Sequence, residues 1–254
     1  MKLNEQTVLV TGGSRGLGAS IVKSFAREGA NVILNYFQSE EAAILLAHEL
    51  GEHVLAVQAD VRDEEQVQRM VEQGEAYFGK PVTTLVNNAL IDFQFNPATQ
   101  KPLEDLFWAD FLKQLEGSIE GTLLPVQACL PGMKAASFGR IINIGTNLVQ
   151  NPVVAYHEYT TAKAGLLGLT RNMAKELGQH GITVNLISGG LLRETDASSV
   201  TTDEVFGIIK ATTPLGKVTT PAELADVTLF FASDWARAVT GQNLIVDGGL
   251  VMNG

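Results

Sequence analysis

Two residues with acid–base side chains, Tyr159 and Lys163, lie four positions apart in the stretch AYHEYTTAKAG, residues 155–165. In a helix this spacing puts both side chains on one face, with Cβ atoms about 5–6 Å apart. A tyrosine ordinarily has a pKa of about 10, and a neighbouring ammonium group lowers that pKa because it favours the phenolate. The pair is therefore a candidate proton donor near neutral pH, and the alternative is a solvated helix face without chemistry.

Other polar side chains of the same stretch are less suited to catalysis. We interpret His157 and Glu158 as surface or rim contacts. The four histidines of the chain are scattered and have no partners at metal-ligand spacing, so we predict no metal site. Tyr156, seven positions before Lys163, is either a packing residue or an aromatic wall of a substrate pocket.

A glycine-rich stretch, TGGSRGLG at residues 11–18, follows an apolar run and precedes an amphipathic pattern. Gly12, Gly16 and Gly18 have the spacing G-x-x-x-G-x-G. Such a stretch makes a tight turn, lets the backbone approach a pyrophosphate closely, and directs a helix N-terminus at negative charge. It predicts a dinucleotide site, and a turn with a purely structural role is the alternative.

The end of the second apolar run, VILNYFQS, bears on which nucleotide would bind. NAD sites usually carry Asp or Glu here to hold the ribose 2′-hydroxyl. This chain has Asn35 and Tyr36 instead. Arg15 is available to face a 2′-phosphate, and Ser14 and Ser39 are available to hydrogen-bond it. We therefore predict NADP (NADPH) rather than NAD; an Arg15 exposed on the surface without a ligand is the alternative.

The elements that must position these residues alternate along the chain. Short β-branched apolar runs are separated by amphipathic stretches of a dozen or more residues, which predicts parallel strands buried on both faces by helices. We expect an α/β fold consisting of a single doubly wound Rossmann domain over residues 1–254, with about seven parallel strands. The apolar runs are residues 7–12, 31–36, 53–58, 82–89, 139–146, 181–188 and 242–249.

Two longer connections depart from this alternation. Residues 189–216 separate the sixth run from the next helical pattern, and connections in such folds usually have about 2–6 residues. We predict that 189–216 is a substrate loop, with Leu191 at its start. Residues 90–102, after the fourth run, offer Phe93 and Phe95 to a substrate.

Composition restricts the possible partners. The chain has 254 residues and a formal net charge of −10, which argues against nucleic-acid binding because that function needs a basic patch. The one cysteine, Cys129, permits no intrachain disulfide. Neither a signal peptide nor a long apolar span is evident, so we expect a cytoplasmic protein with no membrane partner.

Six short motifs follow one another along the chain: TGGSRGLG, Asp60–Val61, NNA at 87–89, YTTAK at 159–163, VN at 184–185 and VDGG at 246–249. Their order and spacing resemble the classical short-chain dehydrogenase/reductase family. The runs GRIIN and GITVN are most similar to the 3-oxoacyl-acyl-carrier-protein reductases and related ketone reductases.

The resemblance implies roles for individual residues. Tyr159 and Lys163 correspond to the family's reactive pair, and Lys163 would also bind the cofactor ribose. Asp60 and Val61 would hold the adenine, and Asn88 and Ala89 would lie along the adenosine ribose. The pyrophosphate would be lined by Gly12, Gly16, Leu17 and Gly18, and further cofactor contacts are expected from Gly190 and Leu192.

Several positions depart from the family pattern. Thr146, thirteen residues before Tyr159, stands where serine is usual, and it keeps the hydroxyl that would polarise the substrate carbonyl. Ser118 aligns with the usual asparagine, which is thought to anchor a water that relays protons to the lysine. Serine cannot reproduce both functions of an amide. Gly145, Leu90 and Gly189 replace the usual serine, glycine and proline.

Two functions of different kinds follow from this resemblance. The first is an NADPH-dependent reductase that converts a small-molecule or acyl-carrier-bound carbonyl, a 3-oxoacyl thioester or a small ketone, into a secondary alcohol. The alternative is a cofactor-binding regulatory or weakly catalytic member of the family. A homotetramer is the assembly that the resemblance implies.

Overall fold

All seven predicted strands are present in the computed structural model, which describes residues 1–91, 96, 99–193, 195, 198–199 and 201–252. They form one parallel sheet in the order β3-β2-β1-β4-β5-β6-β7. Their bounds are β1 Thr7–Val10, β2 Asn31–Tyr36, β3 Val54–Gln58, β4 Thr84–Asn87, β5 Gly139–Thr146, β6 Ile182–Gly189 and β7 Asn243–Val246.

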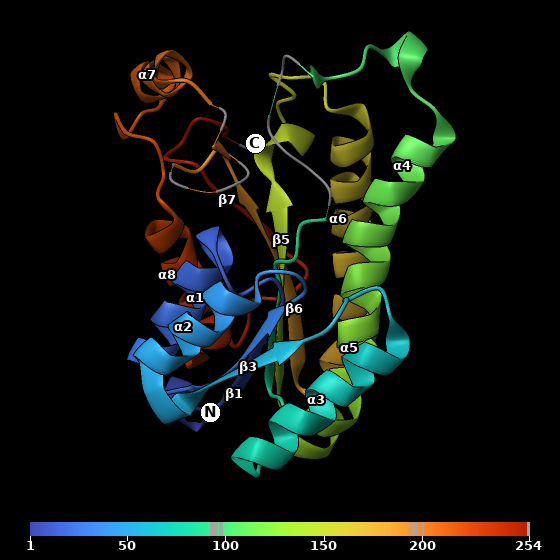
Figure 1. Cartoon of the computed structure of the whole chain (residues 1–254), viewed down its shortest axis with the longest axis vertical. Helices are drawn as coiled ribbons and strands as arrows, with labels where there is room; N and C mark the ends of the chain where they lie inside the picture. The colour runs from blue at the N-terminus through green and yellow to red at the C-terminus, as the bar shows by residue number, and fades with distance from the viewer. Residues whose placement is uncertain (92–95, 97–98, 194, 196–197, 200, 253–254) are drawn as a thin grey trace.

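Helices cover both faces of the sheet (Figure 1). One face carries α1 (Gly16–Arg27), α2 (Glu40–Leu50) and α8 (Pro221–Ala232), and the other carries α3 (Glu64–Phe78), α5 (Gly121–Ala136) and α6 (His157–Leu177). Helix α4 (Trp108–Leu115) packs against α6. This arrangement confirms the predicted α/β, doubly wound Rossmann fold.

Strand β1 shows why the apolar runs are continuous. Val8 and Val10 point to one face and pack in the cluster that contains Phe25, whereas Leu9 points to the other face and packs in the cluster that contains Met70. Successive residues of a strand alternate between faces, so a strand covered on both sides needs apolar residues at every position.

The strand order places a crevice at one end of the sheet. Strand β1 pairs with β2 on one side and with β4 on the other. The strands that follow β1 in the sequence therefore extend the sheet first in one direction, through β2 and β3, and then in the other, from β4 onward. In open α/β sheets ligands bind outside the carboxyl ends of the strands at such a switch point. Thr11 after β1 and Asn88 after β4 both lie there.

The predicted substrate loop, residues 189–216, contains a helix of its own, α7 (Asp203–Thr212). Thr202 caps it by accepting a hydrogen bond from the Val205 backbone N–H at 3.4 Å. Phe206 is the buried apolar residue of this helix. The connection is therefore long because it carries a helix between β6 and α8.

No helix among the described residues combines the length and the apolar character that crossing a membrane requires.

Candidate active site

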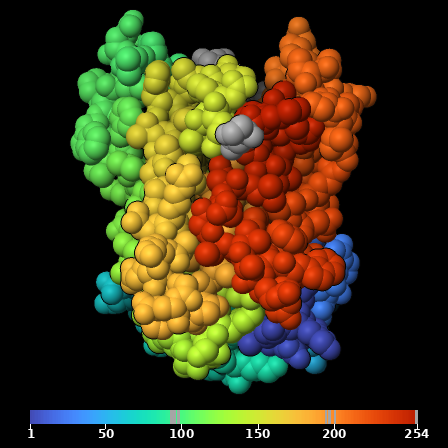
Figure 2. All heavy atoms as spheres, turned by 180° about the vertical axis from the view of Figure 1, so that it is seen from behind, coloured from blue at the N-terminus to red at the C-terminus, as the bar shows by residue number. Residues whose placement is uncertain are grey.

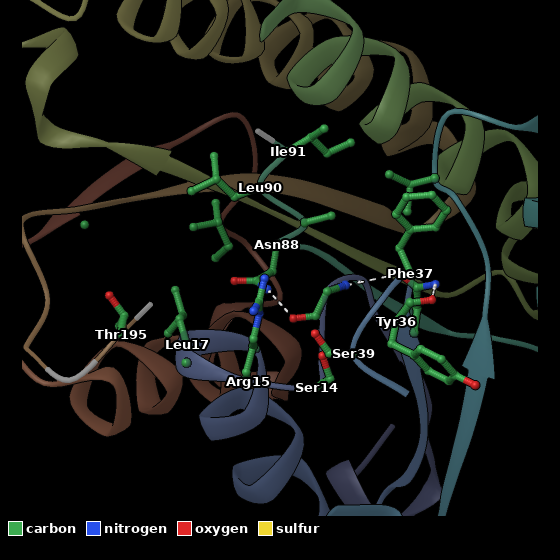
Figure 3. Close-up of a pocket in the computed structure, with 18 of the residues that line it drawn as sticks. Ser14, Arg15, Leu17, Tyr36, Phe37, Ser39, Asn88, Leu90, Ile91 and Thr195 are labelled. Atoms are coloured by element: carbon green, nitrogen blue, oxygen red, sulfur yellow. Dashed lines mark hydrogen bonds between the residues drawn. The ribbon is translucent and has the colours of Figure 1, made fainter. Parts of the chain in front are cut away.

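A cleft of about 470 Å³ opens at the carboxyl ends of the strands (Figure 3). The residues predicted from the sequence to bind a cofactor all line it, and so does Thr146. They are Gly12, Ser14, Arg15, Gly16, Leu17, Gly18, Asn35, Tyr36, Ser39, Asp60, Val61, Asn88, Ala89, Tyr159, Lys163, Gly190 and Leu192.

Two asparagines hold the glycine-rich turn in place. The Asn88 side-chain amide donates to the carbonyl oxygens of Thr11 at 3.0 Å and Gly12 at 3.1 Å. The Gly12 backbone N–H donates to Asn35 Oδ1 at 3.1 Å. Gly12 has a φ of +62° and Gly16 of +53°, a left-handed conformation that glycine adopts without steric cost. The turn is thus shaped by the protein itself.

The turn is also packed so closely against the start of α1 that one position admits only glycine. A Cβ on Gly18 would lie 2.0 Å from the Gly12 carbonyl oxygen and 2.7 Å from Asn88 Nδ2, so only glycine fits. Helix α1 begins at Gly16, and its first residues line the cleft. The unpaired backbone N–H groups and the positive end of a helix favour an anion at this position. These residues fit the phosphates of a dinucleotide.

At the end of β2, Asn35 has a structural function that the sequence did not predict. Its amide donates to the carbonyl oxygens of Ala59 at 3.0 Å and Tyr36 at 3.3 Å, so both amide hydrogens are used within the protein. Figure 3 shows the Tyr36 ring pointing away from Arg15 and Asn88. Burial and the nearby Glu40 carboxylate raise the pKa of Tyr36. Both residues line the cleft, but neither directs a free hydrogen-bonding group to its centre.

Basic side chains gather on the wall near β2. Arg15 extends from the start of α1 into the cleft, with Ser14 and Ser39 beside it (Figure 3). Arg62, which the sequence analysis did not single out, also lines the cleft. Its guanidinium donates to the Asp60 carboxylate at 2.8 and 3.0 Å and holds the pKa of Asp60 below its usual range. This wall therefore presents two guanidinium groups.

The candidate catalytic side chains come from β5 and α6. Thr146 is the last residue of β5, and its hydroxyl hydrogen-bonds the Tyr159 side chain, which helps to stabilise the phenolate. Lys163 Nζ lies 5.9 Å from the centroid of the Tyr159 ring and donates to the Ile144 carbonyl oxygen at 2.8 Å. The predicted helical spacing thus places Tyr159 and Lys163 on one face of α6, and the end of β5 brings Thr146 to them at the cleft.

Burial controls the proton affinities of this group. It raises the pKa of Tyr159, and the hydrogen bond from Thr146 only partly opposes that rise. Burial also lowers the pKa of Lys163 to about 8. We expected the lysine ammonium to lower the tyrosine pKa, but in this structure loss of hydration is the larger effect because both groups are buried.

Other predicted site residues do not line this cleft among the residues that the structure describes. Ser118 lies buried in a π-helical turn, Glu116–Glu120, that follows α4. Tyr156, 3% exposed, packs in a small cluster with Leu148 and Tyr159, which favours its interpretation as a packing residue. Leu191 is also absent from the wall, although its neighbour Leu192 contributes to it. Phe93 and Phe95 lie outside the described residues.

Several lining residues were not predicted. Leu90 and Ile91 form an apolar wall above Asn88 (Figure 3), and Leu90 had been noted only as a departure from the family pattern. Thr195, in the connection after β6, lies at the left of the same view, on the side away from Tyr36 and Phe37. Their positions depend on the paths of irregular segments, which hydrophobic periodicity does not encode. The other unpredicted lining residues are Phe37, Gln38, Ala59, Arg62, Ile144, Gly145, Gly189 and Leu224.

Comparison with known proteins agrees with this geometry. A family model described as "Enoyl-(Acyl carrier protein) reductase" matches residues 12–251. The 3-oxoacyl-[acyl-carrier-protein] reductase FabG of Staphylococcus aureus is 35% identical over 257 residues, which cover 99% of this chain and 100% of that protein. The FabG of Aquifex aeolicus is 32% identical and covers 98% of this chain and 99% of its own.

A solved structure gives the same result. The protein titled "a putative gluconate dehydrogenase" from Agrobacterium tumefaciens superposes with a TM-score of 0.87 at 30% identity. The match covers 99% of this chain and 98% of that one. The family model and the relatives each cover nearly the whole chain, so the resemblance seen in the motifs is confirmed. The chain belongs to the short-chain dehydrogenase/reductase family of oxidoreductases.

Proposed function

We propose that this protein is an NADPH-dependent reductase that converts the carbonyl group of a 3-oxoacyl thioester or a small ketone into a secondary alcohol. The observation that carries the proposal is the hydrogen-bonded pair of Thr146 and Tyr159, with Lys163 beside it, in the same cleft as the glycine turn.

Proton transfer is the part of the reaction that the chain itself supplies. When bound, reduced nicotinamide supplies the hydride that adds to the carbonyl carbon. Tyr159 gives its hydroxyl proton to the carbonyl oxygen, and Thr146 donates a hydrogen bond that polarises the same oxygen. Lys163, with a pKa of about 8, carries an exchangeable proton near neutral pH and returns a proton to the phenolate.

The preference for NADPH is supported by the charge of the cleft wall. A 2′-phosphate is an anion, and Arg15 brings a guanidinium group to the wall, whereas the charge of Arg62 is already paired with Asp60. Ser14 and Ser39 add hydroxyl donors. NAD sites usually carry an acidic residue at the end of β2 to hold the ribose 2′-hydroxyl. This chain has Asn35 and Tyr36 there instead. Hydrogen bonds between charged partners are the stronger ones, which favours the phosphorylated nucleotide.

The class of substrate is supported by the apolar wall and by the relatives. Leu90, Ile91 and Leu192 offer aliphatic surface to an acyl chain. The relatives in Staphylococcus and Aquifex are named as 3-oxoacyl-[acyl-carrier-protein] reductases. A small free ketone is the other candidate, because the chain has a net charge of −10 and an acidic carrier protein would be repelled wherever no basic patch lies.

Ser118 favours a second candidate function. It lies in a π-helical turn away from the cleft wall, and a hydroxyl replaces the amide that the family uses in its proton relay. A cofactor-binding protein with weak or regulatory activity is therefore the alternative to an efficient reductase.

An NADPH-consumption assay with acetoacetyl thioesters and a panel of small ketones separates the two. Turnover with one substrate class supports the reductase and identifies that class. Tight NADPH binding without turnover on the whole panel supports the alternative. Failure to bind either nicotinamide nucleotide contradicts both candidates.

A homotetramer in the cytoplasm completes the proposal. Large apolar side chains are exposed around α4, which supports burial against other copies of the chain. These side chains are Leu103, Phe107, Trp108 and Leu112. Light scattering that gives the mass of a monomer, about 27.2 kDa, would refute the assembly.

A further inference from the structure

A side chain next to the candidate catalytic group reaches the far end of the chain. Asn147 directly follows Thr146 and is 6% exposed. Its Nδ2 donates to Asp247 Oδ2 at 2.9 Å, across 100 residues of sequence. Asp247 is also buried, at 5% exposed. A buried carboxylate needs hydrogen-bond donors, so this contact is part of what keeps Asp247 in place.

Asp247 in turn shapes the C-terminal turn. Its Oδ1 accepts from the Gly249 backbone N–H at 3.0 Å, and its Oδ2 accepts from the Val251 backbone N–H at 3.0 Å. Gly248 and Gly249 have φ angles of +73° and +88°, which glycine tolerates. The turn after β7 thus folds around one carboxylate, and Asn147 supplies its side-chain donor.

The C-terminal turn supports one end of the 189–216 segment. The Leu215 backbone N–H donates to the Gly248 carbonyl oxygen at 3.2 Å. A Cβ on Gly248 would lie 2.6 Å from Thr213 Cγ2, and one on Gly249 would lie 3.2 Å from Pro214 Cγ. Residues 213–215 directly follow α7. Figure 2 shows the C-terminal region, in red, between the yellow region around residue 150 and α7, in orange.

The Gly190 end of the segment lies against Asn147 and Asp247. A Cβ on Gly190 would lie 3.0 Å from Asp247 Cβ and 3.2 Å from Asn147 Nδ2. Gly190 also lines the cleft. Both ends of the segment that carries α7 therefore contact Asn147, Asp247 or the turn that Asp247 organises.

We infer that Asn147 is a positioning residue: through Asp247 it ties Gly190, at the cleft, and residues 213–215, after α7, to the end of β5, and so holds both ends of the connection that carries α7 in place for a bound substrate. The inference that the segment meets substrate rests on the proposed function. The mechanical connection does not, because it stands on hydrogen bonds within the chain.

The first test measures that connection without any substrate. Asn147→Leu keeps a similar volume and removes the donor. Hydrogen–deuterium exchange of the segment 203–216 should become about tenfold faster, because the buried charged hydrogen bond that supports its end is lost. Asn147→Asp, which keeps the shape but places a carboxylate against Asp247, should have the same effect if Asn147→Leu does not fold.

A matched control distinguishes this connection from general destabilisation. Asn185, on β6, is 1% exposed; its amide donates to the Val239 carbonyl oxygen at 2.9 Å and its Oδ1 accepts from the Gln242 backbone N–H at 3.1 Å. These contacts brace the connection before β7 and not the 189–216 segment. Asn185→Leu should lower the Tm while exchange in 203–216 stays as in the wild type.

The second test uses the substrate found in the ketone and thioester panel. Asn147→Leu should raise KM for that substrate about tenfold and change kcat less than about threefold. Unchanged exchange in 203–216 in both Asn147 variants would overturn the inference. Faster exchange with an unchanged KM would overturn the role in substrate binding. An inactive wild type would instead contradict the proposed function and leave the exchange result to decide the connection.

Discussion

Lys163 donates from Nζ to the carbonyl oxygen of Ile144 at 2.8 Å, and this bond joins the helix that carries Tyr159 to the strand that ends in Thr146. The lysine is 5% exposed, and the bond determines the direction of its side chain before any ligand arrives. The same burial makes the ammonium form costly, which gives the protein a measurable pH dependence.

The free energy of unfolding should rise between about pH 8 and pH 10. The pKa of Lys163 is lowered from 10.5 to about 8 in the folded protein, so the unfolded chain binds more protons in this window. Each pH unit contributes about 1.4 kcal/mol, or roughly 2–3 kcal/mol in all. Urea unfolding of the wild type and of Lys163→Met at several pH values measures the difference. Parallel pH profiles for the two proteins would contradict the lowered pKa.

Replacement of Tyr159 by phenylalanine should abolish reduction while the Kd of NADPH stays near the wild-type value. The ring is retained, so packing with Leu148 and Tyr156 is kept, but the proton donor is lost. Turnover and fluorescence titration of NADPH check the two parts. If the variant kept most of its activity, the proton would have another source.

Thr146→Val should lower kcat about 100-fold, because it removes a preorganised donor to the carbonyl oxygen without a change of shape. Thr146→Ser should retain activity near that of the wild type, since it keeps the hydroxyl. Steady-state kinetics on the substrate found in the panel decide this. A loss in Thr146→Ser together with full activity in Thr146→Val would mean that the methyl group of Thr146, and not its hydroxyl, is what matters.

Gly18→Ala should prevent nucleotide binding and destabilise the fold. The added Cβ would lie 2.0 Å from the Gly12 carbonyl oxygen, so the turn would have to move, at a cost of about 1–3 kcal/mol. Gly168, inside α6, has no atom within 4 Å of an added Cβ, and Gly168→Ala should stabilise by about 0.5–1 kcal/mol. Thermal unfolding and NADPH titration of both variants check this pair. A Gly18→Ala protein that binds NADPH normally would show that the turn is not the phosphate site.

The ratio of kcat/KM with NADPH to that with NADH should exceed one and should fall about tenfold or more in Arg15→Leu, because a charge-assisted hydrogen bond to the 2′-phosphate is lost. Arg27, at the far end of the same helix, is paired with Glu28 and Asp226 on the surface. Arg27→Leu should leave the ratio unchanged. A wild-type preference for NADH would refute the assignment.

The sheet was predictable because its signal is local and repeated. Every strand from Thr7–Val10 to Asn243–Val246 overlaps a predicted apolar run, since strands buried on both faces need continuous apolar residues. The glycine turn and the pair of Tyr159 and Lys163 were predictable for a related reason: each is a short segment whose spacing alone determines its geometry.

Contacts between distant segments were not predictable in this way. Nothing local to Asn35 indicates that its amide bonds Ala59, or local to Arg62 that it turns toward the cleft. The pKa of Tyr159 was misjudged because spacing identifies a neighbour but does not measure the loss of water around both groups. The sequence could not decide whether Tyr156 forms a pocket wall, because that depends on the direction in which one ring at the start of a helix points.

The hydrogen bonds from Asn88 and to Asn35 have an entropic consequence for the nucleotide. They hold the turn at Gly12 in shape in the free protein, so its backbone freedom is lost during folding and not during association. A preorganised receptor binds with less ordering cost and with little rearrangement. The pyrophosphate thus meets a surface already complementary to it, and the affinity reflects the contacts made rather than the work of arranging them.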